Sequence, residues 1–213
     1  MRELHLKMSM SLDGFVAGPN GESDWIFRTN DDEADAWSIA SVGNASLHIM
    51  GSKTFHDMIS FWPFVEDIFA APMNDIPKAV FTQHGAASVD KTPSQASFDN
   101  SASSLQEGPK KKKPDAKVLK GWQDAYIAEG PMKDEIAKLK RQDGNPIIAH
   151  GGAGFARSLI ATGLVDEFRM LVHPVALGEG LPIFTKLDEP LSLKLIETVR
   201  FPKGAVGEVY RPN

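Results

Sequence analysis

The stretch that most constrains the fold of this 213-residue chain is residues 146–184, PIIAHGGAGFARSLIATGLVDEFRMLVHPVALGEGLPIF. Residues 146–150 form an apolar run of strand length, and a pattern of helical spacing then runs from residue 155 to Gly163, where a helix would end. A second apolar run begins at Phe168 and predicts another strand. Strand, helix and strand in this order predict an α/β unit around which the rest of the chain is organised.

Three glycines, Gly151, Gly152 and Gly154, lie between the first of these strands and the helix. A helix that opens on glycines presents bare backbone N–H groups at its positive end, which suits a phosphate. A tight turn that needs glycine only for its backbone dihedral angles would show the same residues. From these residues alone, an anion site and a structural turn stay open as explanations.

Strand and helix patterns also alternate along the rest of the chain. Strands are predicted at residues 4–10, 46–50, 78–82 and 126–128, and helices at 31–43, 52–62 and 131–142. The helix at 31–43 is expected to bury Ala36, Ile39, Ala40 and Gly43. Alternating runs at 191–201 and 206–210 predict an antiparallel hairpin turned at residues 202–204. The predicted fold class is α/β: a mostly parallel sheet with helices on both faces and an antiparallel C-terminal edge.

Length and composition fit one domain over residues 1–213. Residues 85–117 are rich in Ser, Ala, Asp and Lys and poor in large apolar side chains, which predicts a low-complexity, flexible insert. The lysine run at 110–113 is either a basic patch for nucleic acid or phosphate, or a solvated surface. Because no aromatic side chains are interleaved with it, we favour the solvated surface.

Several classes of function are excluded or disfavoured by composition. The net charge of −5 gives no reason to expect a nucleic-acid partner, and the absence of cysteine excludes disulfides, thiol catalysis and thiolate metal sites. No apolar run approaches membrane-spanning length, so a cytoplasmic protein without a membrane partner is expected. No metal site is expected either, because the remaining histidines are not spaced like ligands: His5, His48, His56, His84 and His173.

Four segments fall where predicted strands end, which is where α/β sheets bind nucleotides: residues 11–18, 50–54, 82–83 and 150–155. A P-loop is excluded because Leu47 occupies the place of its first glycine. A Rossmann fingerprint is excluded because the glycines come late in the chain and the acidic pair at 166–167 precedes their strand.

With these segments the chain resembles the dihydrofolate reductase superfamily. It is more closely similar to the branch containing the C-terminal reductase domain of the bifunctional riboflavin-biosynthesis deaminase-reductase and stand-alone bacterial relatives. The resemblance covers nearly the whole chain outside residues 85–117. It rests on Ser11-Leu12-Asp13-Gly14 with Ala17, on Trp25, Met50-Gly51, Lys53-Thr54 and Gly151-Gly152, and on the run 164–184. It implies the three-layer αβα fold of that superfamily and a homodimer.

The resemblance further implies NADPH as hydride donor and gives each segment a part in binding it. The pyrophosphate would be bound by Gly151, Gly152, Ala153, Gly154 and Phe155. Phosphate and ribose would be bound by Gly51, Ser52, Lys53 and Thr54, and the adenosine phosphate by Thr82 and Gln83. The nicotinamide would lie against Ala17 and Trp25, near the centre of the sheet.

Two departures from the family pattern bear on cofactor and substrate. Ser52 stands where the relatives usually carry arginine, which removes a bidentate phosphate donor that Lys53 replaces only in part. His150 stands where the riboflavin reductases have a glutamate that contacts substrate. Ser23, by contrast, matches a serine that contacts substrate in them. An amino-pyrimidine substrate of the riboflavin pathway is therefore in doubt.

Candidates for proton transfer are Asp35 and Asp13. Asp35 lies fifteen residues before Met50, the spacing of the pterin-binding carboxylate in dihydrofolate reductases; a carboxylate on the helix surface is the competing explanation. Asp13 is either catalytic or a cap for the loop backbone, which an Asp before Gly favours. His150 is either a pocket ligand or a core histidine. Trp62 and Phe184 are either pocket walls or plain core.

The sequence therefore predicts a stand-alone NADPH-dependent reductase that transfers a hydride to a small pterin- or pyrimidine-like acceptor. One alternative is a true 5-amino-6-(5-phosphoribosylamino)uracil reductase of riboflavin biosynthesis, or a dihydrofolate reductase. The other is a non-catalytic nucleotide-binding protein, for which the missing arginine at Ser52 is the best support.

Overall fold

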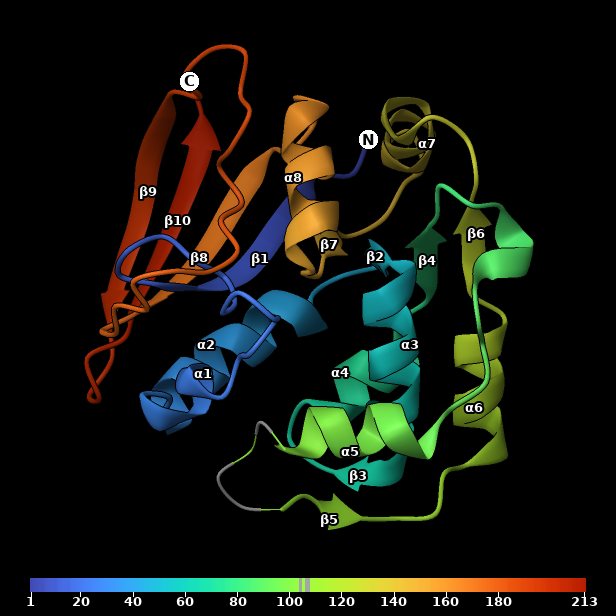
Figure 1. Cartoon of the computed structure of the whole chain (residues 1–213). Helices are drawn as coiled ribbons and strands as arrows, with labels where there is room; N and C mark the ends of the chain where they lie inside the picture. Colours follow the sequence, from blue (N-terminus) through green and yellow to red (C-terminus); the bar gives the residue numbers. More distant parts are fainter. Residues whose placement is uncertain (104, 106–107) are drawn as a thin grey trace.

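The computed structural model describes residues 1–103, 105 and 108–213. An eight-stranded sheet crosses this part of the chain in the order β6-β4-β2-β7-β1-β8-β10-β9 (Figure 1). Its strands are β1 (Leu4–Ser11), β2 (Leu47–Gly51), β4 (Lys78–Phe81), β6 (Tyr126–Ala128), β7 (Ile147–Ala149), β8 (Glu167–His173), β9 (Leu193–Arg200) and β10 (Val206–Pro212). The first six in chain order are parallel, and β10 is antiparallel to both β8 and β9. The predicted α/β class and its antiparallel C-terminal edge are confirmed.

Helices cover both faces of this sheet. They are α1 (Trp25–Arg28), α2 (Asp32–Gly43), α3 (Ser52–Phe61), α4 (Ala70–Asp75), α5 (Gln95–Ser103), α6 (Ala116–Gln123), α7 (Met132–Lys140) and α8 (Ala153–Ala161), with short 3-10 turns η1 (Trp62–Phe64) and η2 (Ala86–Ser88). Helices α7 and α8 pack on one face through Ile136, Leu139 and Leu159. Helices α2, α3, α4 and α6 supply the apolar clusters of the other face. The described helices include none that is both long and apolar enough to cross a membrane.

Helix α2 begins as predicted, but it buries a different face. The Asp31 side chain accepts hydrogen bonds from the backbone N–H groups of Glu33 and Ala34, which caps the first turn. The buried positions are Ala34, Ser38, Ser41 and Val42, and the predicted inner face of Ala36, Ile39, Ala40 and Gly43 is wrong. Alanine and glycine are spread around this helix, so its apolar periodicity is too weak to select a face. Packing of Ala34 against Leu171 decides the orientation instead.

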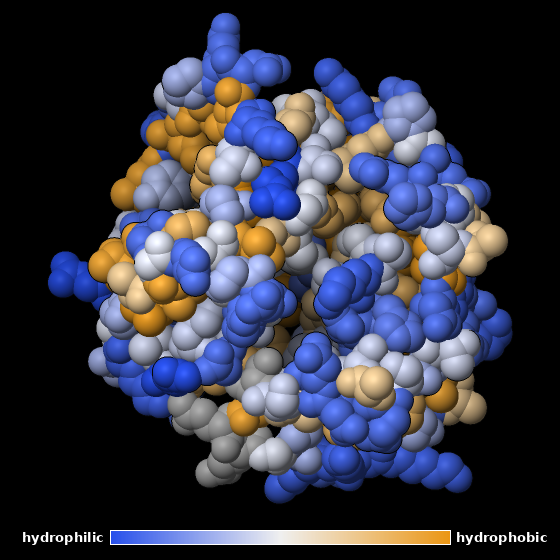
Figure 2. Space-filling model, in the orientation of Figure 1, coloured by the Kyte–Doolittle hydropathy of each residue, from blue (hydrophilic) through white to orange (hydrophobic). Residues whose placement is uncertain are grey.

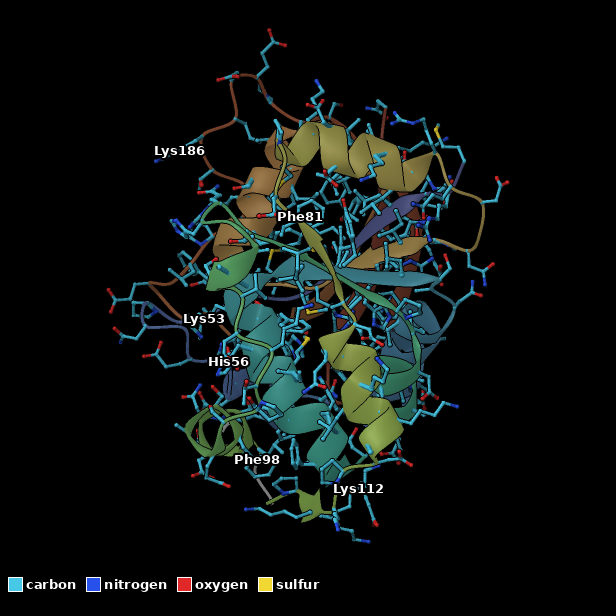
Figure 3. The ribbon with its side chains drawn as sticks, turned by 90° about the vertical axis from the view of Figure 1, so that its right-hand side faces the viewer. Lys53, His56, Phe81, Phe98, Lys112 and Lys186 are labelled. Carbon is cyan, nitrogen blue, oxygen red and sulfur yellow. The ribbon has the colours of Figure 1, made fainter. Side chains whose placement is uncertain are left out.

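The segment 85–117 contains regular structure that its composition did not indicate. Helix α5 buries Phe98, whose ring stacks on Phe61 with centroids 5.7 Å apart. The first two lysines of the basic run form β5 (Lys110–Lys111), which pairs with β3 (Val65–Glu66). Lys111 lies over the Phe98 ring, and Figure 3 shows Phe98 and Lys112 at the same end of the molecule. Residues 104, 106 and 107 lie outside the described residues, and the flexibility of the insert stays a prediction.

Candidate functional site

A large cleft opens where the parallel strands end, with a volume of about 2200 Å³. Figure 2 shows the surface hollowed near the middle of this face. The lining comes from the loop after β1, the turns after β2, β4 and β7, the facing sides of α1, α2 and α8, and part of α5. These turns are the segments that the sequence placed at strand ends, so the tertiary structure brings them to one site.

The glycine turn between β7 and α8 forms one wall of the cleft. Gly152 is the N-cap of α8 and has a φ of 64°, a conformation that favours glycine. A Cβ atom built on Gly151 would lie 2.9 Å from the Met8 Cε atom, and one on Gly152 would lie 3.1 Å from Thr54 Oγ1. The backbone angle therefore favours glycine at position 152, whereas a Cβ at position 151 would meet only the flexible end of the Met8 side chain. The first N–H groups of α8, which have no partner within the helix, also lie at this wall and are suited to bind an anion.

The turn between β2 and α3 faces the glycine turn. The Thr54 hydroxyl donates a hydrogen bond of 2.9 Å to the Gly151 carbonyl, and a Cβ on Gly51 would meet the Phe155 Cβ at 3.3 Å. Gly51, Ser52, Lys53 and Thr54 all line the cleft, as do Gly152, Ala153, Gly154 and Phe155. Direct contact between the two turns fixes the distance between two of the predicted phosphate-binding segments.

Positive charge around this wall does not come from the predicted lysine alone. The Lys53 side chain is 87% exposed, and its ammonium pairs with Asp57 at 2.9 Å. Arg157 on α8 and Lys186 also line the cleft, and both were missed from the sequence. Figure 3 shows Lys53 and Lys186 on the same side of the molecule. Gly154 and Arg157 lie three residues apart on α8 and therefore on one helix face. This spacing is the sequence feature that could have pointed to Arg157 as a cleft residue.

The turn after β4 borders the same wall through Thr82 and Gln83. The Thr82 hydroxyl accepts a hydrogen bond from the His84 backbone N–H at 3.1 Å and lies 3.0 Å from the Ser88 hydroxyl. The Phe81 ring lies against Phe155, with centroids 5.6 Å apart. Thr82 and Gln83 are therefore part of one continuous surface with the glycine turn.

Two groups of opposite charge, Lys7 and Asp35, line the cleft, and Lys7 was not selected from the sequence. Burial lowers the pKa of Lys7 to about 8, and the Asp35 carboxylate opposes that shift. Burial raises the pKa of Asp35, whose carboxylate accepts a hydrogen bond from the Asn30 amide. Lys7 occupies one of the polar positions that alternate with apolar positions along β1. A lysine within an inner strand of the sheet is the feature that could have indicated a functional residue.

His150 lines the cleft next to this pair. Its ring is buried and contacts His48 edge-on, with centroids 4.6 Å apart. Burial, with the neighbouring His48 second, lowers the pKa of His150 well below its ordinary value, so the ring is neutral at pH 7. Its Nε2 atom has no hydrogen-bond partner among the described residues. This nitrogen is itself buried within the wall of the cleft.

Four predicted site residues do not line the cleft: Asp13, Trp25, Gly151 and Phe184. The Asp13 carboxylate accepts hydrogen bonds from the backbone N–H groups of Leu177 and Gly178 and from the Ser11 hydroxyl, so it caps the loop. Trp25 is buried, donates its indole N–H to the Glu22 carbonyl and packs edge-on against His173. Phe184 is 38% exposed and packs on Phe168. Ala17, Ser23, Asp35, Trp62 and His150 do line the cleft.

A second cluster of titratable groups lies at the start of β1 and β8, away from the cleft. Glu3, His5 and Glu167 hold potential ligand atoms within 4.8 Å of one another. The carboxylates are already paired, because Arg211 contacts both of them and Arg169 contacts Glu167 at 2.6 Å. This geometry is that of an ion-pair network that joins three strands.

Comparison with known proteins places this geometry in a family. Residues 2–206 match the model of the RibD C-terminal domain. YyaP, an uncharacterized protein of Bacillus subtilis (strain 168), is 29% identical over 213 residues, which cover 100% of this chain and 96% of YyaP. The structure of a putative riboflavin biosynthesis protein from Shewanella sp. PV-4 matches with a TM-score of 0.68 and 20% identity, over 100% of this chain and 99% of that one. Dihydrofolate reductase from Enterococcus faecalis matches with a TM-score of 0.54 and 12% identity, over 99% and 96%. The chain therefore belongs to the RibD C-terminal domain family and has the dihydrofolate reductase-like fold.

Proposed function

We propose that this protein is an NADPH-dependent reductase that transfers a hydride to a small pterin- or pyrimidine-like heterocycle. The observation that carries the proposal is the contact between the two glycine turns, in which Thr54 joins the β2–α3 turn to Gly151. Two N-terminal helix ends then border one cleft, next to Arg157 and Lys186. Backbone N–H groups, a hydroxyl and cationic side chains are the donors that a pyrophosphate and a further phosphate require.

NADPH bound in this way would supply a hydride to an electrophilic carbon of the acceptor. The glycine turns and the N-terminus of α8 would hold its pyrophosphate, and Thr82 and Gln83 would contact the adenosine phosphate. Ala17, one of the two residues predicted to contact the nicotinamide, lines the cleft, while the other, buried Trp25, donates its indole N–H to the Glu22 carbonyl of the same loop. Arg157 and Lys186 provide cationic charge at the same wall as Ser52, which stands in place of arginine.

Titration with NADPH and NADH tests the cofactor assignment directly. Trp62 lines the cleft, so its fluorescence is expected to fall on binding, whereas Trp25 and Trp122 are buried. We expect micromolar binding of NADPH and weaker binding of NADH. Equal, millimolar binding of both nucleotides would contradict the proposal. NADPH binding without turnover of any pterin or pyrimidine would favour the non-catalytic nucleotide-binding protein.

The Lys7→Met variant tests proton transfer on the cleft floor. A lysine with a pKa of about 8 suits a general acid at neutral pH, because it is protonated and still releases a proton readily. We expect kcat for the acceptor found by screening to fall about 100-fold, a typical contribution of a positioned acid. Wild-type kcat should decline as pH rises above about 8, when the ammonium is lost, and the variant should lack that decline.

Two further variants separate this role from a general loss of folding. Lys112→Met removes an exposed lysine at the far end of the molecule and should leave kcat unchanged (Figure 3). Asp35→Asn removes the carboxylate that raises the pKa of Lys7, so the alkaline decline should move to lower pH. A Lys7→Met enzyme with normal kcat and an unchanged pH profile would eliminate Lys7 as the acid.

A further inference from the structure

The cationic side chains that line the cleft and most of its carboxylates lie on different helices and loops. Lys53, Arg157 and Lys186 belong to α3, α8 and the loop that follows β8. The opposite side, formed by the loop into α1, by α2 and by the segment after β3, carries carboxylates: Glu22, Asp24, Asp35 and Asp67. Two carboxylates also line the cleft outside this second side: Asp57 on α3, which pairs with Lys53, and Glu129 after β6. Among the described residues that line this second side, Lys7 on the floor is the one lysine or arginine.

These carboxylates are not neutralised equally. Asp24 pairs with Arg28, and the charge of Lys7 lies near enough to Asp35 to lower the pKa of that carboxyl group. Asp67 is exposed and close enough to Asp35 that its charge contributes to the raised pKa of that carboxyl group. Glu22 accepts hydrogen bonds from Asn20, which is uncharged. The positive charge of Lys7 offsets the negative charge of Asp35. The charges of Asp67 and Glu22 are not offset among the described residues of this side, so the second side of the cleft has a net negative charge.

The uncharged lining of this side suits a flat ring. Phe27, Trp62 and Phe69 contribute aromatic surface, and Trp62 and Phe69 pack together with centroids 6.2 Å apart. Ser38 on α2, together with Asn100 and Ser101 on α5, adds neutral polar groups. The helix within the segment 85–117 therefore supplies part of this wall. The neutral ring of His150 also lines the cleft.

We infer that the acceptor is a neutral or cationic planar heterocycle that carries no phosphate or carboxylate group. The inference rests on the proposed function, because it assigns the basic side of the cleft to NADPH and the acidic side to the acceptor. Among the described residues, no cationic side chain forms a salt bridge with Asp67. Its carboxylate would therefore repel a phosphate and attract an amino group. A phosphoribosylamino-pyrimidine is disfavoured on this ground, independently of the His150 substitution.

Matched pairs of probes test the charge preference. Binding of pterin against pterin-6-carboxylate, and of uridine against uridine 5′-monophosphate, would be measured by calorimetry on the NADP⁺-loaded protein. We expect the uncharged member of a pair to bind at least 10-fold more tightly. The Asp67→Asn variant keeps an oxygen that can accept the Phe69 backbone N–H, so it should retain the loop conformation. It should reduce the ratio of the affinities for the uncharged and charged probes at least threefold.

Asp143→Asn is the matched control, because it makes the same charge change at a fully exposed position outside the cleft lining. This variant should leave the ratio of the affinities for the two probes of each pair unchanged. Tighter binding of the phosphate or carboxylate member would overturn the inference. If the protein binds no NADPH, the proposed function fails, while the probes can still be measured on the protein alone.

If none of the probes binds, quenching of Trp62 fluorescence by charged quenchers still tests the charge of this side of the cleft. Trp62 is partly exposed on the acidic side, and the difference between wild type and Trp62→Phe isolates its signal from the other tryptophans. Relative to neutral acrylamide, caesium should quench Trp62 at least twofold more efficiently than iodide, and Asp67→Asn should reduce that ratio. More efficient quenching by iodide would show a cationic surface and overturn the inference.

Discussion

The Gly152→Asp variant is expected to lose NADPH affinity by about 1000-fold. Gly152 caps α8 with a φ of 64°, and an added side chain would project at Thr54, which joins the two turns. Two charge-assisted hydrogen bonds to phosphate, at about 2 kcal/mol each, account for a loss of this size. A carboxylate at the helix N-terminus would also repel the pyrophosphate. Fluorescence titration on the variant measures the loss.

Gly163→Asp provides the control, because it introduces the same side chain at nearly the same backbone angle. Gly163 has a φ of 69°, lies just beyond the other end of α8, and has no atom within 4 Å of an added Cβ. Both variants should lose about 1 kcal/mol of folding stability from backbone strain. Only Gly152→Asp should lose NADPH binding. Equal affinities in the two variants would show that the glycine turn is a structural turn and not a phosphate site.

Folding stability is expected to fall steeply below pH 6.5 because buried histidines are neutral in the folded state. Burial is the main cause that lowers the pKa of His48 and of His173 to about 4 in each case. Both side chains are fully buried. An unfolded chain takes up a proton at each position near pH 6.5, while the folded chain does not until about pH 4. Protons therefore favour the unfolded state as pH falls through this window.

The expected loss at pH 5 is about 2 kcal/mol for each of these two histidines, or about 4 kcal/mol together. His150, whose pKa burial also lowers, adds to this loss. Urea unfolding at pH 7.5 and pH 5.0 measures it at a pH where most exposed carboxylates remain charged. The double variant His48→Gln with His173→Asn should show a smaller pH dependence that keeps the contribution of His150, although it is less stable at pH 7.5. His84→Gln, at an exposed position, should unfold with the wild-type dependence. A wild-type stability that is flat between these pH values would contradict the prediction.

The order of elements was available from local patterns. Apolar runs of strand length and the glycines that follow them predicted β1, β2, β4, β7 and the α8 unit, because these signals depend only on neighbouring residues. The antiparallel hairpin of β9 and β10 was predicted for the same reason. Helix α2 was placed correctly along the chain but rotated wrongly, since its alanines mark no single face.

The candidate site divides in a similar way. Turn residues such as Gly152 and Thr54 were found because special backbone angles and small polar side chains leave a mark in the sequence. Lys7 and Arg157 were missed, because the signals for them, a lysine within a strand and an arginine one helical turn after Gly154, are weak without a cleft beside them. Asp13 was selected as an acid for proton transfer and Phe184 as an aromatic pocket wall, but Asp13 caps a loop and Phe184 packs on Phe168.

The sequence by itself determined the α/β class, the glycine turns at strand ends and the resemblance to the reductase family. Only the tertiary structure decided which residues meet, because strand order in the sheet brings together segments more than a hundred residues apart in the chain. It placed β7 between β1 and β2, so that His150, Lys7 and Thr54 border one cleft. The charge of that cleft is a sum over side chains from many elements, and burial sets the protonation of Lys7 and His150. Neither quantity exists before the chain has folded.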